Sequence, residues 1–212
     1  MTTALHCLSS AEFKNADRLV LMDLELTCWP DSLRTFWADP RRPPEVLELG
    51  LVAYDPRTDT IVSTFSSLVR PRLNPVLSAY CLNLLRVPQH DIDTAPSLPE
   101  AAGRAAAWAN DVGFAASTTC TWCTLDRSWL HDDAARVGCA DPFEGWPHVN
   151  LSSLLMQALG DPPGPTPPRD AMTQRMGLAP IPDRHRALAD AADLARFCSL
   201  LRALSSEVLR AQ

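Results

Sequence analysis

The clearest pattern in the chain is a nearly continuous apolar run at residues 18–26, RLVLMDLEL, which is interrupted by two acids close to its end. A run of this kind is typical of a central strand that is buried on both faces. Residues 45–55 (EVLELGLVAYD) and 60–70 (TIVSTFSSLVR) are also strand-like, with DPRTD as the turn between them. We therefore predict a buried strand followed by a β-hairpin.

The helical patterns follow the hairpin. Residues 98–111 (LPEAAGRAAAWAND) are rich in alanine and predict a helix. A short strand is expected over 116–122, then a helix over 125–138 that ends at a glycine, and a last helix over about 187–209. Strands that come first as a hairpin and then alternate with helices predict an α/β fold, in which helices cover both faces of a mixed sheet.

The length and composition of the chain predict one domain. Its 212 residues suffice for a single α/β domain, which we expect to span residues 1–212 with its core at about 18–207. Two proline-rich segments, 31–44 and 161–168 (DPPGPTPP), are predicted to be loops. No apolar run approaches the roughly 20 residues of a membrane span, and the first residues lack the pattern of a secretory signal. A soluble, cytoplasmic protein without a membrane partner is expected.

The cysteines are scattered rather than clustered. The chain has 7 of them, an odd number, and this pattern is typical of reduced thiols and not of a disulfide framework. Cys120 and Cys123 form a CxxC pair, but a zinc site needs about four ligands and no second pair completes one. We interpret them as half-buried cysteines beside Trp122. A zinc or thiol-based protein stays as an alternative, and stoichiometric zinc in the purified protein would indicate it.

The net charge of −6 argues against a protein that binds long nucleic acid through bulk electrostatics. It does not exclude a nuclease, because acidic metal ligands add to the negative count and positive charge is needed only near the cleaved end. The basic residues are arginines except for Lys14. Arginine suits bidentate phosphate contacts, although genomic base composition would also explain this bias.

The two acids in the first strand, Asp23 and Glu25, are candidates for metal binding. Residues two apart on a strand point to the same face, so both carboxylates lie together at the end of a buried strand. At about 4 Å they repel by roughly 4 kcal/mol at an effective dielectric near 20. A divalent cation between them reverses the sign, and oxygen ligands favour magnesium or manganese. A solvated strand end with two chance acids is the alternative.

Three motifs in order resemble those of a known family. LMDLELTCW resembles the first motif of the DEDDh 3′→5′ exonucleases, the DnaQ-like branch of the ribonuclease H-like superfamily, as it occurs in the histone-mRNA exonuclease-like subgroup and its bacterial relatives. TWCTLDRSWL resembles the second motif, whose acid falls on Asp126. HRALAD resembles the third, an H-x4-D whose members fall on His185 and Asp190. The resemblance spans about residues 18–200 and implies a ribonuclease H-like fold with a mixed five-stranded sheet flanked by helices on both faces.

The resemblance also implies a two-metal site for Mg²⁺ or Mn²⁺, with the ions about 3.5–4 Å apart. Asp23 would bridge both ions, Glu25 and Asp190 would hold the one that binds the nucleophilic water, and Asp126 would assist the other. His185 would be the general base. It must precede the last helix, because five helical residues span about 500° and would separate it from Asp190.

Each later assignment has an alternative. Asp126 also fits a first-turn acid favoured by the helix dipole. Asp183 and Asp193 lie close to Asp190, and only the H-x4-D spacing selects Asp190. His148 is interpreted as structural.

Substrate contacts are implied at three positions. The backbone of Leu26 and Thr27 would contact the terminal sugar, and Trp122 would stack on the terminal base, a contact worth about 1–3 kcal/mol per base. The alternative for Trp122 is a core tryptophan under the sheet edge. Trp29 is a weaker stacking candidate.

The chain departs from the family pattern in two places. Leu84-Leu85-Arg86-Val87 stands where relatives commonly have a Leu-Thr-Gly-Ile-like segment near the end of the substrate. Arg86 is a candidate phosphate contact or an exposed helix-end residue. The loop at 161–168 and the segment after it are less basic than expected, which suggests short substrates or weak processivity.

The function predicted from the sequence is a metal-dependent 3′→5′ exonuclease. It would release nucleoside 5′-monophosphates from single-stranded 3′ ends, with RNA favoured over DNA. The alternatives are a DNA-directed trimming or proofreading-like exonuclease and a catalytically silent binding module on the same fold.

Overall fold

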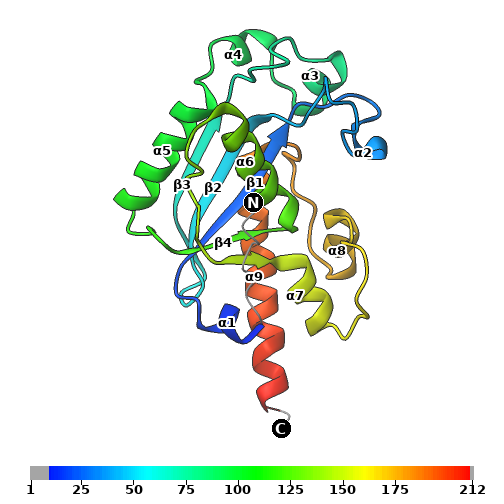
Figure 1. The fold of residues 1–212 in the computed structure, drawn as a ribbon. Helices are drawn as coiled ribbons and strands as arrows, with labels where there is room; N and C mark the ends of the chain where they lie inside the picture. Colours follow the sequence, from blue (N-terminus) through cyan, green and yellow to red (C-terminus); the bar gives the residue numbers. More distant parts are fainter. Residues whose placement is uncertain (1–9, 211–212) are drawn as a thin grey trace.

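A five-stranded mixed sheet forms the centre of the computed structural model, which describes residues 10–210 (Figure 1). The strand order is β3-β2-β1-β4-β5, in which β1 to β3 are antiparallel and β4 and β5 run parallel to β1. The strands are β1 (Leu19–Leu26), β2 (Val46–Asp55), β3 (Thr60–Leu68), β4 (Thr118–Thr121) and β5 (His148–Asn150). The predicted hairpin and the mixed five-stranded sheet are confirmed.

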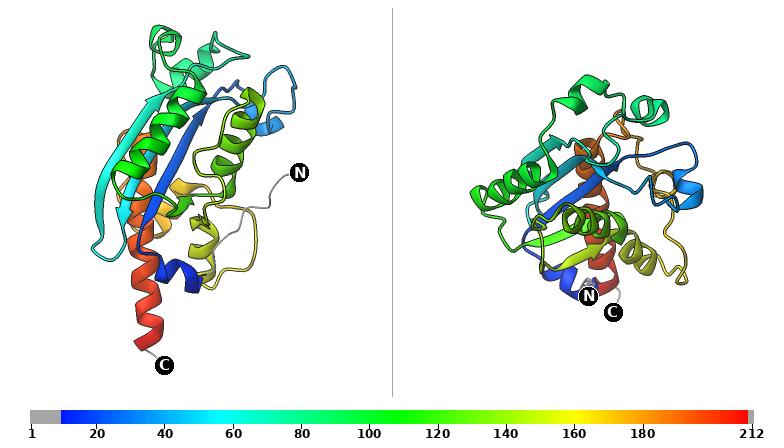
Figure 2. Two further views of the ribbon diagram at one scale, coloured as in Figure 1. Left: turned by 60° about the vertical axis from the view of Figure 1, so that its left-hand side comes forward. Right: turned by 45° about the horizontal axis from the view of Figure 1, so that its top comes forward.

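Helices cover both faces of this sheet (Figure 2). The long helix α9 packs on β1 and β2 from one side, whereas α5 and α6 pack on the other. The helices in the described residues are α1 (Ser10–Asn15), α2 (Ser32–Thr35), α3 (Ala79–Leu85), α4 (Gln89–Asp93), α5 (Leu98–Asp111), α6 (Thr124–Val137), α7 (Leu151–Ala158), α8 (Arg169–Arg175) and α9 (Ala187–Arg210). In this described part, no helix is both long and apolar enough to cross a membrane.

Strand β1 is buried along its whole length, as its apolar run predicts. Leu19 and Leu21 pack into the core on the α9 side, while Val20 and Met22 pack into the core on the side of α5 and α6. Because successive side chains alternate between the faces of a sheet, the next odd-numbered residues continue the α9 face. The two acids of β1 therefore point toward the start of α9.

Most predicted boundaries agree with the structure. The helix predicted over 98–111 is α5, with Ser97 and Glu100 forming a capping box, and the segment 161–168 contains no helix or strand. The predicted loop at 31–44 is not wholly irregular, because it contains the short helix α2.

Gly50 allows the start of α9 to lie directly on the sheet. It is the register partner of Asp23 in the pairing of β1 with β2. A Cβ at this position would lie 2.1 Å from the carbonyl carbon of Ala187, the first residue of α9. No side chain fits at that distance, so glycine is required for the close approach between β2 and α9.

Substitution of Gly50 tests this approach. Gly50→Ala should lower the free energy of unfolding by roughly 1–3 kcal/mol, because the methyl group overlaps backbone atoms that belong to a different element. Urea-induced unfolding measures the change. Gly103→Ala is the matched control: nothing lies within 4 Å of its added Cβ, and alanine in helix α5 should stabilise by up to about 1 kcal/mol. Equal stability of Gly50→Ala and the wild type would contradict the close approach.

Candidate active site

Three of the predicted carboxylates meet where β1 faces the start of α9. One oxygen each from Asp23, Glu25 and Asp190 lies within 4.8 Å of the other two. None of the three residues is more than 9% exposed, although Asp190 is far from the other two in sequence. An oxygen-only set of this size suits a hard divalent cation such as Mg²⁺ or Mn²⁺, so the residues present fit a divalent metal.

Asp126 lies next to this group, in the first turn of α6. It is outside the set of mutually close oxygens, but its charge contributes to raising the pKa of both Asp23 and Glu25. Burial raises the pKa of Asp126 itself to about 6, against the lowering effect of Arg169. The structure therefore brings all four predicted acids into one site, with Asp126 at its margin.

The acids of β1 bind protons more tightly than ordinary carboxyl groups. Burial raises the pKa of Asp23 well above its usual value, and it raises that of Glu25 to about 8, with further contributions from Asp190 and Glu48. Removal from water disfavours the charged form, and neighbouring negative charges add to this effect. A cation at this site reverses both effects, since it favours ionised carboxylates.

Two arginines that the sequence did not single out contact the acids. Arg169, the first residue of α8, donates from Nη1 to Asp23 Oδ1 at 3.2 Å and from Nη2 to Asp190 Oδ1 at 2.6 Å. Arg184 forms an ion pair with the same oxygen of Asp190, with Nε at 3.1 Å. The sequence gives little indication of these contacts, because the direction of an arginine side chain after a proline-rich segment is fixed only by the tertiary structure.

His185 lies in the loop before α9, as the motif spacing predicts. Its backbone N–H donates to Asp190 Oδ2 at 2.8 Å, and its φ of 63° is in the left-handed region. The side chain is exposed. Partial burial lowers its pKa, aided by Arg184 and opposed by Asp190. The imidazole is therefore neutral near neutral pH and able to accept a proton.

A second ion pair, in which only the carboxylate is buried, anchors the same loop to β2. Glu48, which is 1% exposed, lies opposite Glu25 in the sheet register. It accepts two hydrogen bonds of 3.0 Å from Arg186, one on each carboxylate oxygen, and a third of 3.3 Å from the backbone N–H of Ala187. This bidentate pair positions the loop and the first turn of α9, and hence Asp190. Sequence reasoning did not identify it, because the partners are far apart in the chain.

The match to a family decides how this site is classified. The model of the RNase T family, described as Exonuclease, matches residues 20–197, a range that includes the four acids and His185. The chain belongs to this exonuclease family. The four acids and His185 occur in the order that the resemblance to the DEDDh exonucleases implies.

Curated proteins similar to this chain include two exoribonucleases. The chain is 29% identical over 132 residues to 3'-5' exoribonuclease 1 of Mus musculus, which covers 62% of this chain and 36% of the relative. It is 31% identical over 90 residues to ERI1 exoribonuclease 2 of Danio rerio, covering 42% of this chain and 15% of the relative. In both cases, the matched part is well under half of the relative's own length.

Solved structures show the same fold. The nuclease domain of 3'hExo, a DEDDh family member bound to rAMP, superposes with a TM-score of 0.76 at 21% identity, covering 90% of this chain and 93% of that one. Cell-death related nuclease 4 (CRN-4) gives a TM-score of 0.72 at 22% identity, covering 90% and 64%. The predicted ribonuclease H-like fold is confirmed.

The stacking role predicted for Trp122 stays a prediction, and most of its side chain lies in the protein core. Its side chain is 8% exposed and belongs to the core on the α9 side. Its ring centroid lies 4.9 Å from that of Phe197 in α9, and its indole N–H donates to the carbonyl of Pro167 at 2.9 Å. Trp122 is thus a core residue that also holds the proline-rich loop.

The predicted sugar contacts fall on atoms that have protein partners. The backbone N–H of Thr27 donates to the Glu45 carbonyl at 2.9 Å, and the Thr27 carbonyl accepts from the Trp37 indole at 2.7 Å. The carbonyl of Leu26 accepts from the thiol of Cys81 at 3.6 Å. The sugar contact of Leu26 and Thr27 stays a prediction. Trp29 is half-buried, with the guanidinium of Arg42 over its ring at 5.3 Å.

His148 is a buried structural residue, as interpreted from the sequence. Its ring nitrogens lie 3.1 Å and 3.2 Å from the hydroxyls of Thr119 and Thr121, and burial lowers its pKa to about 4. Cys120 is buried and Cys123 is half-buried. In the part of the chain that the structure describes, the only group of three or more side chains placed to hold a metal is the acidic one. The CxxC pair therefore has no ligand set for zinc among the described residues.

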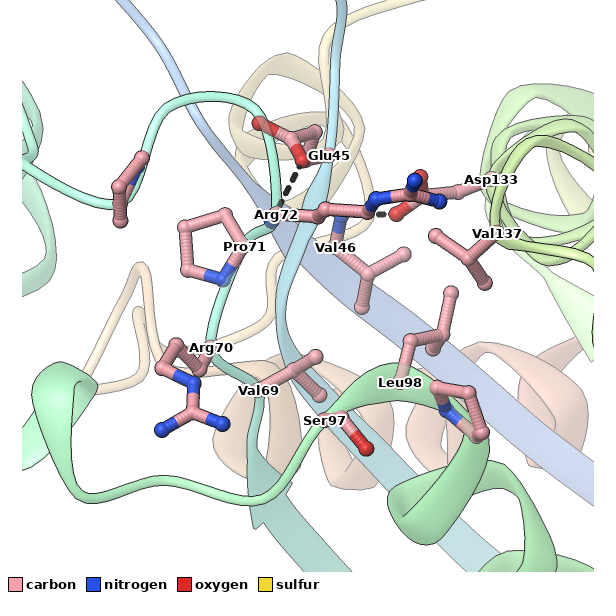
Figure 3. Close-up of a pocket in the computed structure, with 12 residues that line it drawn as sticks. Glu45, Val46, Val69, Arg70, Pro71, Arg72, Ser97, Leu98, Asp133 and Val137 are labelled. Atoms are coloured by element: carbon pink, nitrogen blue, oxygen red, sulfur yellow. Dashed lines mark hydrogen bonds between the residues drawn. The ribbon is translucent and has the colours of Figure 1, made fainter.

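A cavity of about 400 Å³ lies away from the acids, between β2, α5 and α6 (Figure 3). Its two carboxylates already bind backbone amides. Glu45 Oε1 accepts from the N–H groups of Arg72 and Leu73, at 2.8 Å each, and Asp133 Oδ2 accepts from that of Val46 at 2.8 Å. Glu45 thus orders the segment that follows β3 and Asp133 binds the start of β2, so both carboxylates already have protein partners.

The raised pKa values predict how metal binding depends on pH. A carboxyl group that is protonated below a pKa of about 8, such as Glu25, must lose its proton to bind an ion. Affinity for Mn²⁺ should therefore fall as the pH is lowered from about 8 to about 6, by roughly tenfold per pH unit for each proton displaced. Isothermal titration calorimetry in two buffers of different ionisation enthalpy measures both the affinity and the protons released. An affinity that is independent of pH, with no proton release, would contradict the assignment.

Proposed function

We propose that this protein is a divalent-metal-dependent 3′→5′ exoribonuclease that releases nucleoside 5′-monophosphates from single-stranded 3′ ends. One observation carries the proposal: Asp23, Glu25 and Asp190 place carboxylate oxygens within 4.8 Å of one another in a family member whose third-motif histidine adjoins them. We propose Mg²⁺ or Mn²⁺ as the metal and two ions per site, as the oxygen-only ligands favour.

The acids of this site have separate proposed roles. Asp23, whose pKa is raised by burial and by the charges of Asp126, Asp190 and Glu25, would hold both ions. Glu25 and Asp190 would hold one ion, and Asp126, at the margin of the site, would assist with the other. When bound, the two ions lower the pKa of the attacking water and neutralise the charge that develops on the phosphate.

His185 accepts the proton of the attacking water on an unprotonated ring nitrogen. Its lowered pKa keeps the imidazole in the basic form. The hydrogen bond from its backbone N–H to Asp190 fixes the loop relative to a metal ligand. Arg186, through Glu48, is a positioning residue for the same loop and does not touch the reacting atoms.

RNA is proposed as the substrate because relatives are named for it. They include 3'-5' exoribonuclease 1, and a similar solved structure, at a TM-score of 0.76, is described as 3'-end specific recognition of histone mRNA stem-loop by a 3'-exonuclease. Mononucleotide release from matched RNA and DNA oligomers tests the choice, and faster release from DNA would favour a trimming enzyme. We also propose a cytoplasmic location, since the described cysteines are all free thiols.

Replacement of Asp190 tests the metal-site assignment. Asp190→Asn should lower the rate of mononucleotide release from a short RNA by at least about a hundredfold, because it removes a charged ligand. Asp193→Asn is the matched control, since Asp193 lies in the same helix, is also buried and is paired with Arg196. Its activity should stay within a few-fold of the wild type. Loss of activity in Asp193→Asn with retention in Asp190→Asn would refute the spacing argument.

Replacement of His185 separates proton transfer from metal binding. His185→Gln should lower kcat by about 10²–10⁴-fold while Mn²⁺ affinity stays close to that of the wild type. The acidic limb of the pH profile of kcat should change in the variant. His90→Gln, at an exposed position in α4, serves as the control and should behave as the wild type. A kcat of His185→Gln within a few-fold of the wild type would exclude the general-base role.

A further inference from the structure

Arg169 lies inside the acidic site rather than beside it. Its side chain is 9% exposed, and its guanidinium bridges the two elements that supply the acids. Nη1 donates to Asp23 Oδ1 in β1 and to the backbone carbonyl of Asp190 in α9, and Nη2 donates to Asp190 Oδ1. The charges of Asp23 and Asp190 in turn raise the pKa of Arg169 against the effect of burial.

The same carboxylates are the proposed metal ligands. A fixed positive charge in hydrogen-bond contact with Asp23 and Asp190 repels a divalent ion that approaches those oxygens. It also occupies lone pairs that the ion needs, since an ionised carboxylate binds only through its two oxygens. The guanidinium and a divalent ion are therefore alternative partners for one set of oxygens.

We propose that Arg169 is an internal counter-cation of the catalytic acids, which a divalent metal ion displaces when it binds. This inference rests on the proposed role of Asp23 and Asp190 as metal ligands. Arg169 neutralises the buried acids until a metal is bound, and it weakens the metal affinity of the site by the free energy needed to break its own contacts. Arg169 thereby sets the metal concentration at which the enzyme becomes loaded.

The backbone around Arg169 is held in place, so the Arg169 side chain alone can move away when a metal ion replaces it at the carboxylates. The core residue Trp122 holds the carbonyl of Pro167, and the Thr173 hydroxyl bonds the carbonyl of Arg169 within α8. Pro168, directly before Arg169, has a φ fixed by its ring. The main chain is thus held on both sides of Arg169, and the long, flexible side chain is the part that moves.

Mn²⁺ binding to the full chain tests the proposal. The protein is treated with EDTA, desalted and titrated with Mn²⁺ alone by isothermal titration calorimetry. Arg169→Gln should bind Mn²⁺ at least about tenfold more tightly than the wild type. Arg169→Lys, which keeps the charge but not the planar fork, should fall between the two. Arg175→Gln, on the same helix in a surface pair with Asp161, should bind as the wild type does.

Thermal unfolding gives a second readout. In EDTA, Arg169→Gln should unfold at a lower temperature than the wild type, because its acids have lost their counter-cation. With excess Mn²⁺ the difference should shrink or reverse, since a tighter ligand stabilises the folded state more. An Arg169 with a purely structural role would instead leave the variant equally destabilised in both conditions.

Two results would overturn the inference. One is wild-type or weaker Mn²⁺ affinity in Arg169→Gln. The other, decisive if that variant does not fold, is wild-type or weaker affinity in Arg169→Lys. Titration of Asp190→Asn separates this failure from failure of the proposed function. If Asp190→Asn binds Mn²⁺ as the wild type does, the metal-site assignment itself is wrong. If it loses binding while the Arg169 variants are unchanged, only the role of Arg169 is wrong.

Discussion

Buried carboxylates repel one another and bind protons more tightly than carboxylates in water. The structure of this protein nevertheless brings several of them together, and the positions of its strands, loops and arginines around the site depend on that constraint. Strand β1 supplies two of the acids, Asp23 and Glu25. Its apolar residues bury the strand on both faces, so these two side chains are buried as well. Helix α9 supplies a third from its first turn. Nearby positive charge stabilises the ionised form of these acids, and the chain provides part of it through Arg169 and Arg184.

The fold brings the acids together by means that are not themselves catalytic. The absence of a side chain at Gly50 lets α9 begin against β2, and the Glu48–Arg186 pair ties the preceding loop to the same strand. Glu48 has a second effect, because its charge raises the pKa of Glu25. A substitution of Glu48 would therefore change both the position of the loop before α9 and the pKa of Glu25, because the same carboxylate holds the loop and contributes charge to the acidic site.

The sequence predicted the features that depend on local pattern. The nearly continuous apolar run at 18–26 identified the central strand, and the rotation of 100° per helical residue placed His185 outside α9. The sequence did not predict contacts between side chains that are far apart in the chain, because these depend on the direction in which each side chain points. Nothing local shows that Phe197 packs against the ring of Trp122. Arg169 follows a loop of prolines, whose course only the tertiary structure fixes.

The hydrogen bond from the backbone of His185 to the carboxylate of Asp190 explains why the spacing within the third motif is fixed. Asp190 reaches back from the fourth residue of α9 to the chain just before the helix begins. One residue more or fewer between them would rotate the carboxylate by about 100° around the helix axis, away from both β1 and the loop. The H-x4-D interval is therefore fixed by the geometry of the helix start. An insertion between Arg184 and the first turn of α9 would break the contacts of Asp190 with Arg184 and His185.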